Sequence, residues 1–275
     1  MKKDKKILEE NFSKDILTGF KKINIGEINN IYVTSNLNQI SKIRISKQRK
    51  LDILLGNLKK TLKKNYTIFS PTSNLDLFNK KYIFDLKKTP SFNMGPLAEY
   101  IRTQKNSVRS MHPFWSVSGF GKNAGYLKKV SRHAYGYGSP WSKMLDLDFQ
   151  QLNLGIHPSK AVTLIHHIET IYGVPYRFNK QFKCSVLKGN KIKKEKFYVS
   201  VFFRNQNIKK RFKLNEHFFL KLKKNKKLKY FKTKHGLEMW SFKMRDFFEI
   251  AINYFNENIF NYLEFEPDLN FQKNL

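Results

Sequence analysis

The sequence of 275 residues contains a single cysteine, Cys184. One cysteine excludes an intrachain disulfide, and this absence favours a reducing, intracellular setting. No apolar run approaches the roughly 20 residues of a membrane-spanning helix, and no apolar signal core follows the N-terminal lysines. We therefore expect a cytoplasmic protein without a membrane span, whose apolar content of 40% builds a real core.

Several common catalytic motifs are also missing. The sequence has no phosphate-binding loop of the Gly-x-x-x-x-Gly-Lys type, no Gly-x-Gly-x-x-Gly and no Gly-x-Ser-x-Gly nucleophile elbow. The adjacent His166 and His167 cannot both face one site on a helix, and the other histidines are dispersed, so we expect no metal centre. Cys184 falls in a predicted strand without a nearby base, which favours a packing role over a nucleophile.

Acidic residues are scarce: 21 Asp and Glu stand against 53 Lys and Arg, a formal net charge of +32. A field of this sign attracts nucleotides, nucleic acids, acidic proteins and anionic membranes, and it repels a polycationic ligand. The alternative is a composition bias, because lysine accompanies abundant asparagine, isoleucine and phenylalanine, as expected of a genome rich in A and T. The sequence leaves both explanations open.

The first part of the chain alternates between helix and strand patterns. An N-terminal helix precedes a strand over residues 30–35. Ser46 is the predicted N-cap of a helix with leucines on one face, and a strand over 66–70 ends at Pro71. The order helix, strand, helix, strand predicts an α/β layered fold.

Later segments extend this pattern. We expect a short helix over 94–102, extended segments over 115–120 and 150–156, and then a helix whose N-cap is Ser159. Beyond Tyr176 the patterns change to strands and hairpins.

A turn over 188–191 is expected to join strands over 182–187 and 197–203. A final helix carries apolar residues from Phe247 to Ile259.

No internal repeat, Pro/Gly-rich linker or low-complexity stretch divides the chain. We therefore expect one domain over residues 1–275, with its core at about 15–263 and a peripheral tail over 264–275.

His166 and Glu169 are candidates for proton chemistry. Three residues apart on a helix, their side chains lie on one face and can approach each other. A histidine with an ordinary pKa is largely neutral near pH 7 and can take a proton. A carboxylate bonded to the ring fixes its tautomer and stabilises the imidazolium. The same spacing also matches an ordinary surface pair, which arises often by chance.

Arg109, Ser110, His112 and Ser116 form a dense polar cluster. Clustered hydroxyls and an arginine suit a phosphorylated or amide-bearing ligand such as a cofactor. The alternative is a loop entering a strand, in which Pro113 sets the backbone and Arg109 is solvated.

Residues 188–232 form a strongly basic segment, with 17 Lys and Arg against two acidic residues. Aromatic residues that could stack on nucleic-acid bases interleave with these charges: Phe212, Phe218, Phe219, Tyr230 and Phe231. Only Arg204 and Arg211 of the cations are arginines, and no RNA- or DNA-binding motif is present. A solvated, lysine-rich strand face is the simpler explanation, so we expect no specific nucleic acid as a partner.

A set of motifs follows in order over about residues 15–177: Val33-Thr-Ser-Asn-Leu37, Phe69-Ser-Pro-Thr72, Thr89-Pro-Ser91 with Met94-Gly95, Arg109-Ser-x-His-Pro-x-x-Ser-Val117, Gly138-Ser-Pro140, Thr163-x-x-His-x-x-Glu169 and Val174-Pro-Tyr-Arg177. Each motif alone is unspecific, but their order and spacing are highly specific. Together they resemble the aminoglycoside 3-N-acetyltransferase family, also called the antibiotic N-acetyltransferases.

The resemblance implies a single three-layer α/β/α domain with a mixed sheet. It implies an acyltransferase that passes the acetyl group of acetyl-CoA directly to an amine of a small-molecule acceptor, an amino sugar or aminocyclitol. In this family pattern His166 is the general base and Glu169 orients it. The implied coenzyme-binding residues are Ser35, Asn36, Ser70, Thr89, Ser110, His112 and Ser116. The acceptor is expected against Tyr135, Tyr137, Ser139 and Thr163.

Two features depart from the family. Asn36 stands where serine is usual, and the acidic residues near the motifs are few: Glu99, Asp146, Asp148 and Glu169. Because aminoglycosides are polycations, a protein of +32 is badly suited to concentrate them. This motivates a second hypothesis, in which the same chemistry acts on a phosphate- or nucleotide-linked amino sugar in surface-polysaccharide synthesis rather than in antibiotic resistance. The sequence does not indicate an oligomeric state.

Overall fold

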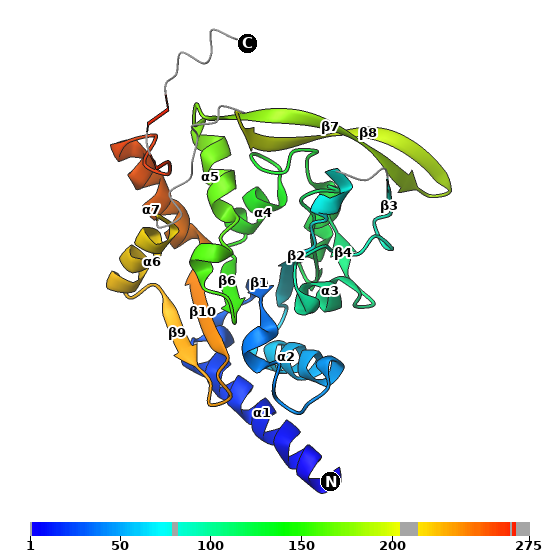
Figure 1. Ribbon diagram of the computed structural model, residues 1–275, viewed down its shortest axis with the longest axis vertical. Helices are drawn as coiled ribbons and strands as arrows, with labels where there is room; N and C mark the ends of the chain where they lie inside the picture. The colour runs from blue at the N-terminus through cyan, green and yellow to red at the C-terminus, as the bar shows by residue number, and fades with distance from the viewer. Residues whose placement is uncertain (1, 79–81, 204–213, 265, 268–275) are drawn as a thin grey trace.

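The computed structural model describes residues 2–78, 82–203, 214–264 and 266–267 (Figure 1). Its helices are α1 (Lys2–Lys22), α2 (Lys47–Thr61), α3 (Pro96–Arg102), α4 (Pro140–Asp146), α5 (Leu164–Tyr172), α6 (Leu214–Lys224) and α7 (Met244–Glu257). Its strands are β1 (Asn30–Ser35), β2 (Thr67–Pro71), β3 (Ile83–Phe84), β4 (Val108–Arg109), β5 (Val117–Gly121), β6 (Gln150–Leu154), β7 (Arg177–Lys188), β8 (Lys191–Phe202), β9 (Lys229–Lys232) and β10 (Glu238–Lys243).

The central sheet has seven strands in the order β4-β5-β2-β1-β6-β10-β9, and it is mixed. β1 runs parallel to both β2 and β6, with Tyr32 opposite Phe69 and Val33 opposite Leu152. β5 and β10 are antiparallel to β2 and β6. A second sheet has the order β3-β7-β8. The mixed sheet confirms the α/β class that the sequence predicted.

Both faces of the central sheet are covered, because alternate residues of β1 enter two different cores. Ile31 and Val33 pack in one core with residues of α1, α2 and α3. Tyr32 points to the opposite face, where the core is built from α4, α5, α6 and α7. A strand covered on both faces is apolar along its length, and β1 is buried from Ile31 to Thr34. The helices therefore form the two outer layers of the expected three-layer fold.

Local patterns located the first elements closely. β1 spans residues 30–35 as predicted, and Ser46 caps α2 by accepting a hydrogen bond from the Arg49 amide at 3.3 Å. The second strand is shifted by one residue and includes Pro71 as its last residue. Phe12 on α1, a few residues before the core expected from about residue 15, is completely buried.

The predicted N-cap at Ser159 is wrong. Pro158–Lys160 form a 3₁₀ turn capped by His157, whose ring nitrogen accepts a hydrogen bond from the Ser159 amide at 3.2 Å. The Gln151 side chain then donates to the Ala161 carbonyl at 2.8 Å. This tertiary bond holds the chain in an irregular segment, so α5 begins only at Leu164.

The hairpin is longer than predicted, since β7 and β8 have 12 residues each. The polar first half of β7 does not show an apolar strand pattern, but its backbone groups are satisfied by pairing with β8. The predicted turn over 188–191 is confirmed, with Lys188 opposite Lys191 at the end of the ladder. The hairpin forms the long ribbon at the top of Figure 1.

The basic segment holds more than hairpin strands. It includes α6, on which Phe218 and Phe219 are buried core residues and are not free to stack on bases. Arg204, Arg211 and Phe212 lie outside the described residues.

The C-terminal helix α7 ends at Glu257, before the predicted Ile259. Leu263 is still buried, and most of the tail predicted over 264–275 lies outside the described part of the chain.

Candidate active site

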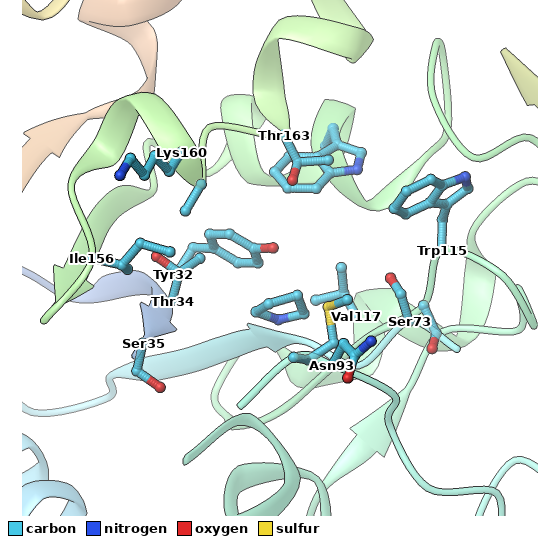
Figure 2. Close-up of a pocket in the computed structure, with 15 residues that line it drawn as sticks. Tyr32, Thr34, Ser35, Ser73, Asn93, Trp115, Val117, Ile156, Lys160 and Thr163 are labelled. Atoms are coloured by element: carbon cyan, nitrogen blue, oxygen red, sulfur yellow. The ribbon is translucent and has the colours of Figure 1, made fainter. Parts of the chain in front are cut away.

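The carboxyl ends of the parallel strands β1, β2 and β6 meet at one edge of the sheet. α/β proteins form their ligand crevices at such an edge, because the loops that leave it turn toward different faces. Ser35, Ser73 and Ile156 lie at or just after these strand ends and line a cavity of about 210 Å³ (Figure 2). Asn93 from the loop before α3 and Thr163 from the segment before α5 complete its walls.

Two glycines let other loops approach the end of β1 closely. Gly95 has φ +85°, and a Cβ there would lie 2.8 Å from the carbonyl oxygen of Ser35. Gly155 has φ +67°, and a Cβ there would lie 2.0 Å from the carbonyl oxygen of Asn36. A side chain at either position would collide with backbone and strain φ, so both positions require glycine.

A second cavity of about 670 Å³ continues from the first. The two share Ser35, Asn93 and Ile156, so together they form one groove along the end of β1, which we call the strand-end groove. Lys47 and Lys50 of α2 line its outer part. Lys50 is buried, which lowers the pKa of its amine, and it donates to a backbone carbonyl at 3.0 Å. The outer part of the groove is therefore cationic.

Aromatic side chains enclose the first cavity, of about 210 Å³, which we call the inner cavity of the groove. Tyr32, Trp115 and Trp141 line it, and the rings of Tyr32 and Trp141 meet edge to face with centroids 5.1 Å apart. Tyr32 is 1% exposed, and its hydroxyl points into the cavity in Figure 2. Burial, and to a smaller extent the neighbouring Tyr135, raises the pKa of Tyr32 well above its ordinary value. The hydroxyl therefore stays protonated and presents a hydrogen-bond donor to the cavity.

The first turn of α5 lies next to this cavity and carries His166. The amide of His166 donates to the carbonyl of Thr163, a cavity residue, at 3.0 Å. His166 Nδ1 lies 2.8 Å from Glu169 Oε2, which confirms that the pair lies on one face of the helix. Glu169 is completely buried, whereas the His166 side chain is 21% exposed.

Glu169 is ionised despite its burial. Burial acts to raise the pKa of this carboxyl, but the charge of Arg177 and the hydrogen bond with His166 outweigh it, so the pKa of Glu169 is lowered from its ordinary value. Arg177 Nε lies 2.9 Å from Glu169 Oε2. The Glu169 carboxylate oxygen, which can only accept, lies nearer to His166 Nδ1 (2.8 Å) than the Arg177 Nη2 donor does (3.1 Å), which favours a proton on Nδ1 and leaves Nε2 to accept a proton.

Arg177, the first residue of β7, is a residue to which sequence reasoning gave no role. Its Nη2 lies 3.1 Å from His166 Nδ1, so its guanidinium contacts both members of the pair. The available signal was the motif Val174-Pro-Tyr-Arg177, which showed the arginine but not its partners. Tyr32 was likewise predicted only as a strand residue, because its place in the cavity depends on which face of the sheet it occupies.

Tyr135 forms the wall behind His166. Its ring lies 5.7 Å from the ring of His166, and it packs against Trp115 and Trp141 with centroids 6.1 Å and 6.4 Å away. The side chain is 2% exposed, and burial raises the pKa of Tyr135 strongly, so it is neutral. Tyr135 shapes the site as a packed aromatic group.

The other residues predicted for the acceptor separate in space. Tyr137 is 92% exposed and lines neither part of the strand-end groove. Ser139 is completely buried and caps α4 by accepting a hydrogen bond from the Ser142 amide at 3.4 Å. Thr163 lines the inner cavity.

The residues predicted for the coenzyme also divide into two groups. Those that line the strand-end groove are Ser35, Asn36 and Ser116. The hydroxyl of Ser70 instead donates to the Val33 carbonyl at 2.8 Å, and that of Ser110 accepts from the Val117 amide at 2.9 Å.

Thr89 and His112 likewise bond within the protein. Thr89 Oγ1 accepts a hydrogen bond from the Asp85 amide at 2.8 Å. His112 Nδ1 accepts from the Trp115 amide at 3.1 Å, which assigns its proton to Nε2, 3.3 Å from the Tyr198 carbonyl. Burial lowers the pKa of His112 to about 4, so the ring is neutral. These two residues shape the loops around the groove.

Arg109 is a buried clamp behind Ser116. Its Nε donates to Ser116 Oγ at 2.9 Å, and its two Nη groups donate to the carbonyls of Thr72 and Thr89. Burial lowers the pKa of Arg109 to about 9, and the side chain is 5% exposed. The alternative of a loop with a solvated Arg109 is excluded, because these bonds use the buried guanidinium to hold Ser116 in the cavity wall.

Cys184 is a buried free cysteine, and burial raises the pKa of its thiol, as expected of a packing residue. Across residues 2–78, 82–203, 214–264 and 266–267, no three or more His, Cys, Asp and Glu side chains are grouped to hold a metal ion. In the same residues no helix has the length and apolarity to span a membrane.

Solved structures share this fold. AAC-IIIb in its binary form with CoASH matches with a TM-score of 0.75 and 15% identity, over 93% of this chain and 98% of that chain. A histidine-to-alanine mutant of aminoglycoside acetyltransferase AAC(3)-IVa in complex with a gentamicin matches with a TM-score of 0.71 and 19% identity, over 93% and 91% of the two chains. The fold is therefore that of the aminoglycoside acetyltransferases.

The family model described as Aminoglycoside 3-N-acetyltransferase matches residues 33–256. The chain belongs to the aminoglycoside 3-N-acetyltransferase family, as its motifs predicted. The aminoglycoside N(3)-acetyltransferase III of Pseudomonas aeruginosa is 32% identical over 99 residues. That match spans 35% of this chain and about a third (36%) of the relative's length.

Proposed function

We propose that this protein transfers the acetyl group of acetyl-CoA directly to an amine of an amino sugar or aminocyclitol. The observation that carries the proposal is His166, which stands in the first turn of α5 beside the strand-end groove, with the buried carboxylate of Glu169 on its Nδ1 at 2.8 Å. A cytoplasmic location and a single domain over residues 1–275 belong to the same proposal.

The strand-end groove fits the acyl donor. Acetyl-CoA supplies an acetyl group activated as a thioester. Ser35, Asn36 and Ser116 offer polar groups along the groove, and Lys47 and Lys50 offer positive charge at its outer part for the coenzyme phosphates. The buried Tyr32 hydroxyl, aimed into the inner cavity, calls for a polar ligand atom at that point.

Residues in and beside the inner cavity take different roles in the proposed reaction. An amine is mostly protonated at neutral pH, and it must lose a proton before it attacks a thioester carbonyl. That first proton leaves to solvent. As the free amine attacks the carbonyl, His166 Nε2 accepts the second proton from the amine nitrogen, and Glu169 stabilises the imidazolium through Nδ1–H. As the N–C bond forms and the C–S bond breaks, His166 returns the proton to the departing sulfur. The Tyr32 hydroxyl donates to the carbonyl oxygen while that oxygen gains negative charge.

A third cavity suits a cationic acceptor. It measures about 570 Å³, lies across the Pro158–Lys160 turn from the inner cavity and shares Lys160 with it. Glu216 of α6 and Glu238 of β10 line it together with Trp240. Carboxylates bind ammonium groups, and an aromatic ring packs against the apolar face of a sugar. We infer that the acceptor approaches through this cavity.

This cavity also supplies acidic residues, which are scarce near the sequence motifs. Glu216 and Glu238 lie more than forty residues after Glu169 along the chain, and only folding brings them beside the loop that precedes α5. The comparisons lend no support to a nucleotide-linked acceptor in polysaccharide synthesis or to nucleic-acid binding, and we do not propose either.

Thiol release tests the proposed function. Purified protein is incubated with acetyl-CoA and, in turn, with neutral, anionic and polycationic amino sugars, and free thiol is measured. We expect thiol release that depends on an amino sugar or aminocyclitol, together with a product heavier by one acetyl group in mass spectrometry. The matching acceptor without its amine serves as the control. Absence of acetylated product from every amino sugar and aminocyclitol would reject the proposal.

Tyr32→Phe tests the hydroxyl in the inner cavity. We expect kcat to fall by roughly 10–100-fold, the contribution of one hydrogen bond to a group that gains charge, with an unchanged dissociation constant for coenzyme A. Thr34→Val is the matched control, since it removes another hydroxyl of the same cavity from the same strand. If Thr34→Val loses the activity and Tyr32→Phe keeps it, the donor is not Tyr32.

A further inference from the structure

Arg177 is held rigidly at the base of the hairpin. Its side chain is 6% exposed, and its guanidinium lies over the ring of Phe202 with the carbon 3.9 Å from the centroid. Its Nη1 donates to the carbonyl of Ser200 at 3.1 Å. With one face stacked and one nitrogen bonded to backbone, the guanidinium cannot turn away from the groups on its remaining side.

The groups on this remaining side are His166 and Glu169, which we call the proton-transfer pair. Arg177 Nε lies 2.9 Å from Glu169 Oε2, and Nη2 lies 3.1 Å from His166 Nδ1. The same Oε2 atom lies 2.8 Å from His166 Nδ1, so one carboxylate oxygen meets both a guanidinium and an imidazole. Three charged or chargeable groups therefore form one compact triangle.

The charges in this triangle oppose each other at His166. A buried carboxylate beside an imidazole favours the imidazolium form, and an imidazolium cannot accept a proton from the acceptor amine. A guanidinium at 3.1 Å from the same ring disfavours that form. Arg177 therefore removes the electrostatic cost that the carboxylate would otherwise impose on a base.

Three other titratable residues that the structure describes near the triangle, Tyr135, Tyr176 and His167, are neutral. Tyr135 packs on the His166 ring and is protonated. Tyr176 lies beside Glu169, and burial together with the Glu169 charge keeps it protonated. His167 turns to the opposite side of α5, where its Nδ1 accepts from the Gly136 amide at 3.1 Å. Arg177 is the group that balances Glu169.

We propose that Arg177 is a positioning residue that keeps His166 in its neutral, proton-accepting form by balancing the buried charge of Glu169. The inference rests on the proposed function, because it assigns how that function's base is kept ready. It goes further in predicting that the hairpin strand β7, which lies after the α5 motif in sequence, sets the working pH range of the site.

The test is a titration of His166 in the intact protein. The sequence has 7 histidines, so ring-labelled histidine gives few NMR signals, and His166→Ala assigns the signal of interest. In Arg177→Gln we expect the midpoint of the His166 titration to rise by about 1–2 pH units. The midpoint on the acid side of the pH profile of kcat/KM is expected to rise by the same amount, while KM for acetyl-CoA stays the same. Equal midpoints in wild type and Arg177→Gln would overturn the inference.

Two further variants separate positioning from simple structural support. Arg177→Lys keeps the positive charge but loses the planar guanidinium that lies over Phe202. We expect the His166 midpoint in this variant to stay near that of wild type. Arg177→Met combined with Glu169→Gln removes both charges, and its midpoint is expected to return toward wild type even if Arg177→Gln alone does not fold. A double variant with a midpoint as high as Arg177→Gln, or an Arg177→Lys midpoint that rises equally, would also count against charge balance.

Arg132→Gln is the matched control. Arg132 also pairs with a glutamate, Glu195 at 2.6 Å, and lies over an aromatic ring of the hairpin, while its Nη1 donates to the Met111 carbonyl at 3.4 Å. We expect it to leave the His166 midpoint unchanged. If wild-type protein acetylates no acceptor, the proposed function fails, whereas the titration still decides whether Arg177 controls the proton on His166.

Discussion

His166→Ala is expected to lower kcat for acetyl transfer by about 10²–10⁴-fold, the contribution of a positioned general base. The nitrogen that takes the proton from the acceptor amine disappears, and no other histidine reaches the same point in the described part of the chain, since His167 turns to the opposite side of α5. Coenzyme binding is expected to persist, because His166 does not line the strand-end groove. Thiol release under saturating substrates measures kcat, and calorimetry measures the coenzyme dissociation constant.

His133→Ala is the control for this variant. His133 is a partly exposed histidine that stacks on Tyr198 at 4.5 Å and lines neither part of the strand-end groove. Its kcat is expected to stay within about twofold of wild type, in keeping with a surface substitution of small effect. Unchanged turnover in His166→Ala would remove this residue from the mechanism.

Glu169→Gln is expected to damage both activity and stability. The substitution keeps the shape of the side chain, but a neutral amide cannot stabilise the imidazolium, and we expect kcat to fall by roughly 10²–10⁴-fold. It also leaves the guanidinium of Arg177 buried without its counter-charge. Breaking a buried ion pair from one side costs about 3–5 kcal/mol of unfolding free energy. Denaturant unfolding at pH 7 measures that loss.

The stability loss should depend on pH. The pKa of Glu169 is lowered in the folded protein, so the carboxylate stabilises the fold fully above its ordinary value of 4.5, and that stabilisation is lost as pH falls below it. The difference in Tm between wild type and Glu169→Gln is therefore expected to be largest near neutral pH and to shrink in acid. A difference that stays constant from about pH 7 to about pH 3 would show that the ionised carboxylate is not the cause.

Glu9→Gln provides the matched control for stability. Glu9 also pairs with an arginine, Arg49 at 2.8 Å, but the arginine of that pair is 52% exposed. Exposed pairs contribute about 0–1 kcal/mol, so we expect little change in unfolding free energy. A loss as large as that of Glu169→Gln would mean that burial does not distinguish the two pairs.

Sequence patterns predicted the local elements well where near neighbours decide the structure. The strand over 30–35 and the Ser46 cap of α2 depend on residues within a few positions, and both are found in the structure. The spacing of His166 and Glu169 is of the same kind, because three residues on a helix bring side chains together whatever lies around them.

Patterns failed where a distant contact competes with the local preference. Ser159 is a good capping residue, but the bond from Gln151 to Ala161 holds the chain out of a helix until Leu164. The polar first half of β7 has no strand pattern, but its pairing with β8 makes it a strand. Folding also gives partners to Ser70, Ser110 and His112, which the resemblance implied as coenzyme-binding residues and whose side chains bond within the protein.

The sequence by itself determined the family, through the order of its motifs, and the helix that carries the proton-transfer pair. Only the tertiary structure decided what surrounds that pair. Arg177 meets His166 because the hairpin begins against α5, and Tyr32 faces the cavity because of its side of β1. Such neighbours come from the packing of sheets and helices over many residues. A local pattern contains the chemistry of a side chain but not the partner that folding places against it.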